Sequence, residues 1–362
     1  MRLKYKFLFK NFPGVFLIKL VPAISFSIIF FYSFLAIFAY YIIPQNTSMS
    51  NEIELSLANK PPGFNIDYIY LYNQNIEKSF FDKLINGENP KYKKIPISKI
   101  EESYTRIYYY DYSDTKFLNK KKIEKKDLKL NNQKNYIHKQ TFFLGTDKFG
   151  RDLLSRIILG SRLSLSAGFF SVVISLFIGL FFGLVAGYYG GKIDLLTQWL
   201  INVVWSIPTL LLVISISLVL GKGYWQLFLS IGLTMWVEVA RVTRGEVLKI
   251  KEKTFIIAIQ SLGFSDFRII IKHILPNIFN PILIISIANF ATAILLESGL
   301  SFLGLGLPPP SPSWGTIIKN HYLYLLIDNP FSAIFPGLCI VLIVISFMSL
   351  GNYLRDFFDV KK

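Results

Sequence analysis

The sequence predicts an all-α integral membrane protein with six transmembrane helices, a cytoplasmic helix pair and a large extracytoplasmic insertion after the first helix. Apolar runs of spanning length, one long polar stretch and the placement of basic residues lead to this fold class. A bilayer core about 30 Å thick needs about 20 mostly apolar helical residues. The six candidate runs are residues 20–43, 163–189, 195–220, 224–240, 281–300 and 331–350.

The first run is expected to stay in place as a membrane anchor. Five Lys or Arg residues and no acidic residue precede it, which is also how a signal peptide begins. The apolar part of a signal peptide, however, spans only about 7 to 15 residues and ends at a small-residue cleavage site. Because this run is longer and no such site follows it, the anchor is favoured.

Basic segments orient the chain. The formal net charge of +16 would suggest nucleic acid binding in a soluble protein, but in a membrane protein basic residues in short loops mark the cytoplasmic side. The basic N-terminus is therefore expected in the cytoplasm. Six crossings bring the C-terminus and the basic segment 241–272 to the same side, so we expect contact with membrane lipid and none with nucleic acid.

Residues 44–156 form the polar insertion, which this topology places outside. Its segment 104–113 (YTRIYYYDYS) is rich in β-forming residues, and its segment 120–129 is basic. A small extracytoplasmic lobe with a solvated charged edge is favoured over a nucleic acid surface. The predicted organisation is residues 1–43 for the N-terminus and first crossing, 44–156 for the lobe and 157–362 for a five-helix core.

Spacing singles out several residues inside the crossings. Gly179, Gly183 and Gly187 recur every four residues, which places them on one stripe where another helix can approach closely. Pro208 is expected to kink the third crossing. Glu297 is the most conspicuous carboxylate, because a charge inside the membrane is costly and functional by default. It lies near the outer end of its helix, where water is expected to reach it, which favours a structural or gating role over a proton relay.

Composition argues against an enzyme or a metal site. The single Cys339 lies in the last apolar run, and the three histidines show no metal-ligand spacing. The crossings contain no nucleophile paired with a base and no set of metal ligands. We therefore expect no cofactor bound by this chain.

The segment 255–277 (FIIAIQSLGFSDFRIIIKHILPN) lies between the fourth and fifth runs and predicts two short amphipathic helices. Gly263 suits a left-handed helix end, Ser265 suits the next N-cap, and Asp266 complements the positive end of that helix. Pro276 is expected to bias Leu275 away from the α region and to stop the second helix. The apolar faces expected from the spacing are Phe255, Ile259 and Leu262 in the first helix, and Phe267, Ile270, Ile271 and Ile274 in the second.

This segment resembles the cytoplasmic coupling loop of ABC importer permeases, where Glu-Ala-Ala is followed by three residues, Gly, about nine residues and Ile-x-Leu-Pro. Ala258, Gly263 and Ile274 through Pro276 stand at matching positions, whereas Ile257 and Ile259 replace the glutamate and the second alanine. The resemblance implies a coupling loop at 249–277. Its ATPase-coupling residues would be Phe255, Ile257, Ala258, Ile259, Leu262, Gly263, Phe264, Asp266, Arg268 and Pro276.

Four further motifs resemble the oligopeptide and dipeptide importer permeases of the peptide/nickel family, in particular the C-type second permease subunit. They are LGTDKFGRDLLSRIILGSRLSLSAG (144–168), AGYYGGKID (186–194), IPTLLL (207–212) and ESGLSFLGLGLPPPSPSWG (297–315), in the order found in that family. The likeness runs from residue 144 to about residue 356. It says nothing about the insertion at 46–140, which is longer than most such permeases carry.

The resemblance implies a permease subunit of an ATP-binding-cassette importer in the inner membrane of a bacterium, forming half of a pathway for oligopeptides or dipeptides. The chain contains no G-x-x-x-x-G-K-[ST] phosphate-binding loop, so ATP and Mg are expected on partner subunits. The expected partners are a second homologous permease subunit, two ATP-binding subunits and an extracytoplasmic peptide-binding protein.

The outer motifs predict a gate, with a structural role as the alternative. Asp147, Arg151 and Asp152 are expected to form a charge cluster at the outer mouth, and Trp314 suits an anchor at the membrane interface. The expected gate or pathway residues are Asp147, Arg151, Asp152, Pro208, Glu297 and Trp314. Two other functions stay open: a permease for another solute such as nickel, and an envelope interaction protein acting through the lobe.

Overall fold

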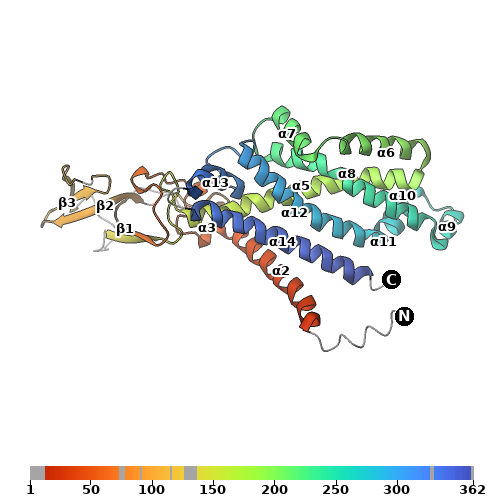
Figure 1. Ribbon diagram of the computed structural model, residues 1–362, viewed down its shortest axis with the longest axis horizontal. Helices are drawn as coiled ribbons and strands as arrows, with labels where there is room; N and C mark the ends of the chain where they lie inside the picture. The colour runs from red at the N-terminus through yellow and green to blue at the C-terminus, as the bar shows by residue number, and fades with distance from the viewer. Residues whose placement is uncertain are drawn as a thin grey trace. The chain divides into compact units, whose positions relative to one another are not determined.

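The computed structural model describes residues 13–72, 78–89, 92–114, 116–125, 137–326 and 330–359. The chain divides into two compact units. The helical unit comprises Met1–Ser33, Leu163–Pro308 and Leu338–Lys362, and the lobe unit comprises Phe34–Arg162 and Pro309–Gly337. Three helices contribute residues to both units (Figure 1): α2 (Pro13–Ile37), α5 (Leu153–Tyr189) and α14 (Phe331–Asp359).

The remaining helices of the helical unit follow one another between α5 and α14. They are α6 (Gly191–Trp205), α7 (Thr209–Leu220), α8 (Tyr224–Lys251), α9 (Thr254–Ser261), α10 (Asp266–Ile269), the π-helical turn η4 (Ile270–Ile274), α11 (Leu275–Asn277) and α12 (Phe279–Leu303). This part of the prediction, a mostly helical membrane protein, is confirmed.

In the part of the chain that the structure describes, four helices are long and apolar enough to cross a membrane, and the bent pair of α6 and α7 makes a fifth if it counts as one span. The four spans are Leu20–Ile37, Leu153–Tyr189, Phe279–Leu303 and Phe331–Phe358. Not all of the six predicted crossings are therefore helices that are long and apolar enough to span a membrane. Within the described residues α8 does not qualify, because Glu238, Arg241, Arg244 and Glu246 lower the mean hydropathy of its second half.

The glycine stripe of α5 lies against α8. A Cβ at Gly179 would lie 2.5 Å from the Val239 Cβ, and one at Gly183 would lie 2.6 Å from the Thr243 Cβ. Gly187 faces Val247 in the same way, with 2.7 Å to its Cβ. The contacts advance in the same direction along both helices, so α5 and α8 run parallel and their backbones approach closely.

Gly183→Ala is expected to destabilise the α5–α8 pair. The new methyl group would also lie 2.7 Å from the Ala240 carbonyl oxygen, which is backbone and cannot rotate away. We expect a loss of about 1–3 kcal/mol from overpacking, measured as a lower midpoint of thermal unfolding in detergent. The matched control is Gly245→Ala in α8, where no described atom beyond the adjacent residues and the backbone of α8 itself lies within 4 Å of the new Cβ. A Gly183→Ala midpoint equal to that of the control would contradict the close approach.

A break at Pro208 separates α6 from α7, whose axes differ by 91°. The kink expected at this proline is present and is large enough to divide the helix. Two contacts join α6 to α8. Next to the break, the Arg241 guanidinium lies 4.0 Å from the centroid of the Trp205 ring. At the other end of α6, Asp194 in its first turn forms an ion pair with Arg244. Sequence reasoning missed this ion pair.

The all-α prediction is wrong for the insertion, which forms a five-stranded antiparallel sheet in the order β4-β3-β2-β1-β5. Alternating β-branched and aromatic residues favour strands where each face of a sheet is covered. One face buries Ile69, Ile97, Ile107 and Tyr109. The strands are β1 (Phe64–Tyr72), β2 (Tyr92–Glu102), β3 (Arg106–Asp111), β4 (Lys121–Glu124) and β5 (Ile137–Phe142).

The charged edge expected at 120–129 corresponds in part to β4, an edge strand of this sheet. Lys121 pairs with Asp111 at 2.7 Å, and Lys120 pairs with Glu101. Charged side chains on an edge strand discourage pairing with another chain. Residues 126–129 of the predicted edge lie outside the described residues.

The lobe unit also contains short helices around the start of α5. α3 (Ala39–Ile42) packs against α5 through a cluster that includes Tyr40, Ile158 and Leu159. The other short elements are α4 (Phe80–Asn86), α13 (Trp314–His321) and the 3-10 turns η1 (Ser48–Ser50), η2 (Leu55–Leu57) and η5 (Tyr322–Leu326).

Candidate functional site

The predicted helix pair is a helix, a glycine turn and a second helix. Gly263 has φ of +78°, the left-handed backbone that the sequence requires of it. The Phe264 N–H donates to the Ile259 carbonyl at 3.4 Å, and the Gly263 N–H donates to the Gln260 carbonyl at 3.0 Å. These two bonds make a Schellman motif, so the turn satisfies the free carbonyl groups at the end of α9.

The second helix is held by the end of α5 rather than by a side-chain cap. Ser265 stands at the N-cap position but its side chain makes no capping hydrogen bond. Asp266 instead accepts a hydrogen bond of 2.7 Å from the Tyr188 hydroxyl. Lys251, at the end of α8, donates to the Tyr188 carbonyl oxygen. The ends of α5, α8 and α10 are therefore connected through one tyrosine.

The inner face of the helix pair is a row of isoleucines. Ile256, Ile269 and Ile274 are fully buried and pack with Val247 of α8 and Leu184 of α5. The apolar faces predicted from spacing are thus divided: Ile259, Ile270 and Ile274 turn inward, whereas Phe255, Leu262, Phe267 and Ile271 are exposed. The inner row fixes the pair rigidly to the ends of α5 and α8.

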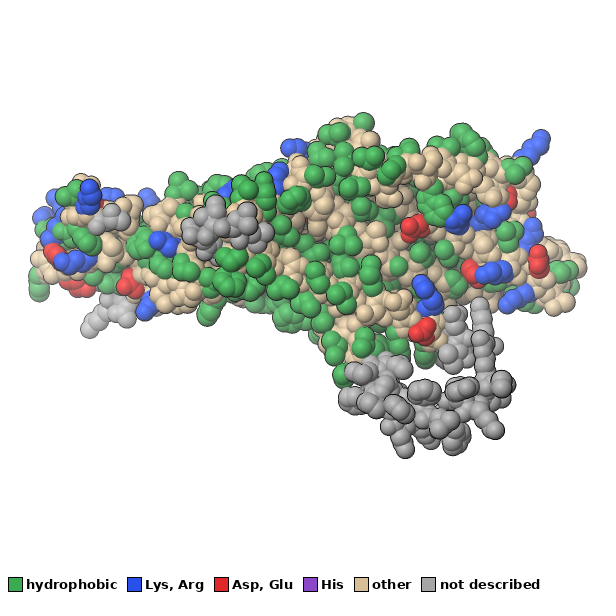
Figure 2. All heavy atoms as spheres, in the orientation of Figure 1, with side chains coloured by type: hydrophobic (Ala, Val, Ile, Leu, Met, Phe, Trp, Pro, Cys, Tyr) green, Lys and Arg blue, Asp and Glu red, His purple; other side chains and the backbone are tan. Residues whose placement is uncertain are grey.

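The outer face is an apolar knob, which we define as Ile257, Leu262 and Phe267. These side chains are 50%, 74% and 76% exposed. Ala258, Gly263, Arg268 and Pro276 are also exposed, and the Arg268 guanidinium lies 4.5 Å from the centroid of the half-buried Phe264 ring. Figure 2 shows basic side chains gathered over the end of the helical unit that carries α9 and α10.

The prediction that Pro276 stops the second helix is wrong. Leu275 keeps α-helical angles, with φ −53° and ψ −45°, and α11 continues through the proline to Asn277. The physical reason is the π-helical turn η4 directly before it. Its wider turn gives the proline ring space and removes the need for the missing N–H.

The charge cluster predicted in the lobe unit forms around Asp147. Arg151 reaches the Asp147 carboxylate through Nε at 2.7 Å and Nη2 at 2.6 Å. Arg156 Nε lies 3.6 Å from the same carboxylate. Asp147 is fully buried, and Arg151 and Arg156 are 5% and 3% exposed. The arrangement is a buried ion-pair network.

Asp152 takes no part in this pairing. Its carboxylate accepts hydrogen bonds from the Ser155 N–H at 2.9 Å and from the Ser155 hydroxyl, which caps the N-terminus of α5. Burial raises the pKa of the Asp152 carboxyl, and the Ser155 hydrogen bonds oppose that rise. Sequence proximity alone suggested that it belonged to the cluster.

Trp314 is not an interfacial anchor, because it is fully buried in the lobe unit. Its indole N–H donates to the Ile157 carbonyl at 3.0 Å. A Cβ at Gly160 would lie 2.9 Å from the Trp314 ring, so the glycine makes room for the indole. The cost of burying the indole N–H is met by this hydrogen bond.

Glu297 is also fully buried, contrary to the expectation that water reaches it. Its carboxylate accepts hydrogen bonds from the hydroxyl groups of Ser164 at 2.9 Å and Ser301 at 2.6 Å. A third hydroxyl, of Ser298, lies 3.4 Å away. The carboxylate joins α5 to α12 inside the helical unit.

His321 is expected to make the lobe unit less stable in acid. Its Nδ1 donates to the Ile317 carbonyl at 2.8 Å, and its Nε2 accepts from the Lys148 N–H at 3.3 Å, so the ring is neutral. Burial lowers the pKa of His321. The unfolded chain therefore binds more protons below about pH 6.5, and stability falls as the pH drops through that range.

The measurement is limited proteolysis of the lobe at pH 7.5 and pH 5.5. Cleavage of the unmodified chain should accelerate in acid, and His321→Gln, which cannot titrate, should remove part of that acceleration. An equal acceleration in both chains would contradict the role of His321.

These features define a class of protein: a polytopic membrane subunit whose helices end in an exposed apolar knob. The chain belongs to the family described as "Binding-protein-dependent transport system inner membrane component", whose sequence model matches residues 179–360. It is therefore a multi-pass inner-membrane subunit of a transport system.

Curated relatives carry permease names. The chain is 36% identical to "Oligopeptide transport system permease protein OppC" of Bacillus subtilis (strain 168), over 70% of this chain and 78% of that protein. It is 39% identical to "Dipeptide transport system permease protein DppC" of Alkalihalophilus pseudofirmus, over 60% of this chain and 72% of that protein. It is 38% identical to "Glutathione transport system permease protein GsiD" of Pectobacterium atrosepticum, again over 60% and 72%.

Proposed function

We propose that this chain is one of two permease subunits of an ATP-driven importer of short peptides. The names of its relatives support this substrate class, since they include oligopeptide, dipeptide and glutathione permeases. In this assembly, a second permease subunit completes the pathway, and a peptide-binding protein delivers the substrate outside. ATP and Mg bind to two partner ATPase subunits rather than to this chain.

The observation that carries the proposal is the apolar knob on a rigidly held helix pair. Exposed apolar side chains outside a membrane mark a protein–protein interface, and the buried isoleucine row transmits force from the knob to α5 and α8. The coupling loop, residues 249–277, thus docks on the ATPase subunits, with Phe255, Ile257, Leu262 and Phe267 as its apolar contacts. The two states of the importer differ in how the helices joined to this loop are tilted.

The proposal includes six crossings, with both termini in the cytoplasm. α8 follows α5 from the Ser171–Phe228 hydrogen bond to the Gly187–Val247 contact. The stretch covers 16 residues of α5 and 19 residues of α8. At about 1.5 Å per residue this is roughly 24–28 Å, close to the thickness of a bilayer core. Because α5 and α8 run parallel, the bent pair of α6 and α7 between them returns across the membrane as one crossing. The same organisation makes 1–43, 44–156 and 157–362 the anchor, lobe and core.

The predicted gate residues divide into two groups. Asp147, Arg151, Asp152 and Trp314 are buried in the lobe unit and brace the outer segments. Pro208 and Glu297 lie in the helical unit, where the break in one crossing and the carboxylate between α5 and α12 border the moving parts. We propose the gate role for this second group.

The test is purification of the tagged chain in mild detergent, with identification of co-purifying proteins and an ATPase assay. We expect a second permease subunit and ATPase subunits, and hydrolysis that increases with tri-alanine and the binding protein. Stimulation by nickel instead of peptide would change the substrate class. A chain that comes alone, with no partner cross-linked through Leu262→Cys, would overturn the coupling role.

A further inference from the structure

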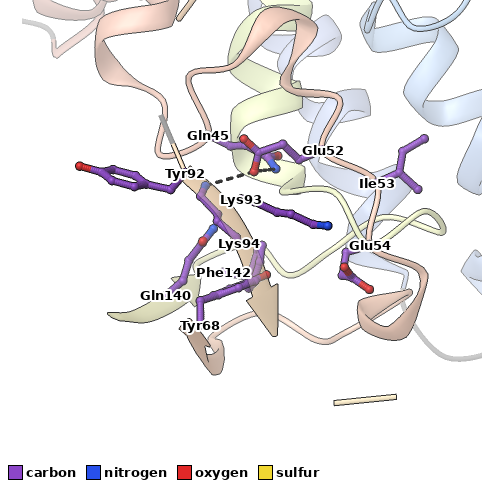
Figure 3. Close-up of a pocket in the computed structure, with 11 residues that line it drawn as sticks. Gln45, Glu52, Ile53, Glu54, Tyr68, Tyr92, Lys93, Lys94, Gln140 and Phe142 are labelled. Atoms are coloured by element: carbon purple, nitrogen blue, oxygen red, sulfur yellow. Dashed lines mark hydrogen bonds and ion pairs between the residues drawn. The ribbon is translucent and has the colours of Figure 1, made fainter. Parts of the chain in front are cut away.

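The lobe unit contains a pocket of about 390 Å³ that neither the family nor the coupling role explains. Its walls come from the segment before η2, from strands β1, β2 and β5, and from Gly150 of the loop that precedes α5. Glu52 closes one side through an ion pair of 3.1 Å with Lys94 and a hydrogen bond of 2.9 Å from Gln45. Figure 3 shows these two interactions as dashed lines.

The pocket also presents one charge of each sign that has no ion-pair partner among the described residues of the lobe. The Glu54 carboxylate accepts a hydrogen bond of 2.8 Å from the Ser56 hydroxyl, and no Lys or Arg of the described residues lies within 4 Å of it. Lys93 is exposed and has no carboxylate within 4 Å among the same residues. In Figure 3 the Lys93 side chain extends toward the side of the pocket where Glu54 lies.

Tyr68 supplies a third polar group. Its side chain is 5% exposed and lines the pocket beside Phe142, and its hydroxyl makes no hydrogen bond to the described residues. A ligand with an acceptor atom in the pocket could receive a hydrogen bond from this hydroxyl. Burial, followed by the nearby Glu54 and Glu52 carboxylates, raises the pKa of Tyr68. The phenol therefore stays protonated as a donor.

The wall that carries Glu54 is fixed in place. Its N–H donates to the Phe149 carbonyl at 3.0 Å. Gly150 has φ of +75°, and a Cβ there would lie 1.8 Å from the Glu54 carbonyl oxygen. A glycine at this position thus lets the backbone approach closely, and Glu54 is held by the same loop that carries Asp147. The polar groups of the pocket are therefore positioned before a ligand arrives.

We propose that this pocket binds the ends of a short zwitterionic peptide. Its α-ammonium group pairs with Glu54, a backbone carbonyl accepts from Tyr68, and its carboxylate pairs with Lys93. A tripeptide extends about 10 Å, and pockets of 300–1,000 Å³ are typical for small ligands. Phe142 and Ile53 contact the side chains. That the ligand is a peptide rests on the proposed transport function. That the ligand carries one positive and one negative group rests on the pocket alone.

The experiment measures binding of tri-alanine to the full chain in lipid nanodiscs, without the binding protein, by isothermal titration calorimetry. N-acetylated and C-amidated tri-alanine are the chemical probes. We expect acetylation and Glu54→Gln each to weaken binding roughly tenfold, as expected for the loss of one charge-assisted contact of about 1.4 kcal/mol. The two changes together should weaken binding no further than either alone. Amidation and Lys93→Gln should likewise each weaken binding roughly tenfold, and together no further than either alone.

Matched controls are Glu102→Gln on β2 and Lys139→Gln on β5, which do not line the pocket and should bind as the unmodified chain does. Equal binding of free, acetylated and amidated tri-alanine would overturn the proposal, as would absence of binding at millimolar peptide. Weaker docking of the binding protein in Glu54→Gln, without peptide binding to the chain, would make the pocket a docking contact instead. If the chain supports peptide transport but does not bind tri-alanine in this pocket, only the pocket proposal fails. If the chain binds tri-alanine here but supports no transport, only the proposed importer function fails.

Discussion

Replacing Leu262 and Phe267 together with aspartate is expected to abolish coupled uptake while the chain still reaches the membrane. These are the two most exposed apolar side chains of the knob, at 74% and 76%. Burying each in a partner would contribute about 1.5–3 kcal/mol. Aspartate loses that contribution and adds the cost of desolvating a charge, so association with the ATPase subunits should weaken by roughly a hundredfold or more.

The measurement is the ratio of ATPase subunit to permease after purification, together with peptide uptake into cells. Leu118→Asp in the lobe unit is the matched control, because Leu118 is 75% exposed and lies far along the chain from the coupling loop. The control should retain both partners and uptake. Normal uptake by the double variant would mean that the knob does not bear the ATPase contact.

The coupling loop was predictable where it depends on local backbone. Gly263 could be placed as a left-handed helix end because a glycine between two amphipathic segments is typical of a helix C-terminus. The same holds for the glycine stripe, since spacing alone puts Gly179, Gly183 and Gly187 on one face. Which helix covers that face could not be predicted, because it depends on residues of α8 more than 50 positions away.

Other features depend on contacts distant in sequence, and these were predicted wrongly. A tryptophan next to a proline-rich segment suits a membrane interface as well as a core. Trp314 can be buried because Gly160 leaves space for its ring and because the Ile157 carbonyl, 157 positions away, accepts its N–H. Glu297 likewise is buried because Ser164 of another helix supplies a hydroxyl. The helix through Pro276 was missed for a local reason, because it depends on the π-helical turn directly before it, which no spacing pattern indicated.

The lobe shows a different limit. The resemblance to known permeases begins at residue 144 and left residues 46–140 without a template. The segment at 104–113 is rich in β-forming residues, but one such segment does not define a sheet. Its order depends on pairing β1 with both β2 and β5, which brings Tyr68 and Lys93 close together. Glu54 reaches the same pocket through its hydrogen bond to the Phe149 carbonyl. The candidate peptide site could therefore be found only in three dimensions.

Asp147→Asn is expected to destabilise the lobe unit by about 3–5 kcal/mol. The substitution keeps the shape of the side chain but removes the carboxylate that faces Arg151 and Arg156, both nearly inaccessible to water. Breaking a buried ion pair from one side leaves an uncompensated charge, which costs about this much. The pair is therefore expected to matter far more than the exposed pairs on the edge of the sheet.

Limited proteolysis of the lobe in membrane vesicles measures the effect, since cleavage follows the population of the opened form when reclosing is fast. Asp147→Asn should be cleaved roughly a hundredfold faster or more. The matched control is Asp111→Asn, which breaks the 2.7 Å pair with the half-exposed Lys121 and should cost at most about 1 kcal/mol. Adding Arg151→Gln to Asp147→Asn should restore part of the protection, because it removes one of the two stranded charges. Equal cleavage of Asp147→Asn and Asp111→Asn would show that the buried Asp147 network stabilises the lobe no more than an exposed ion pair does.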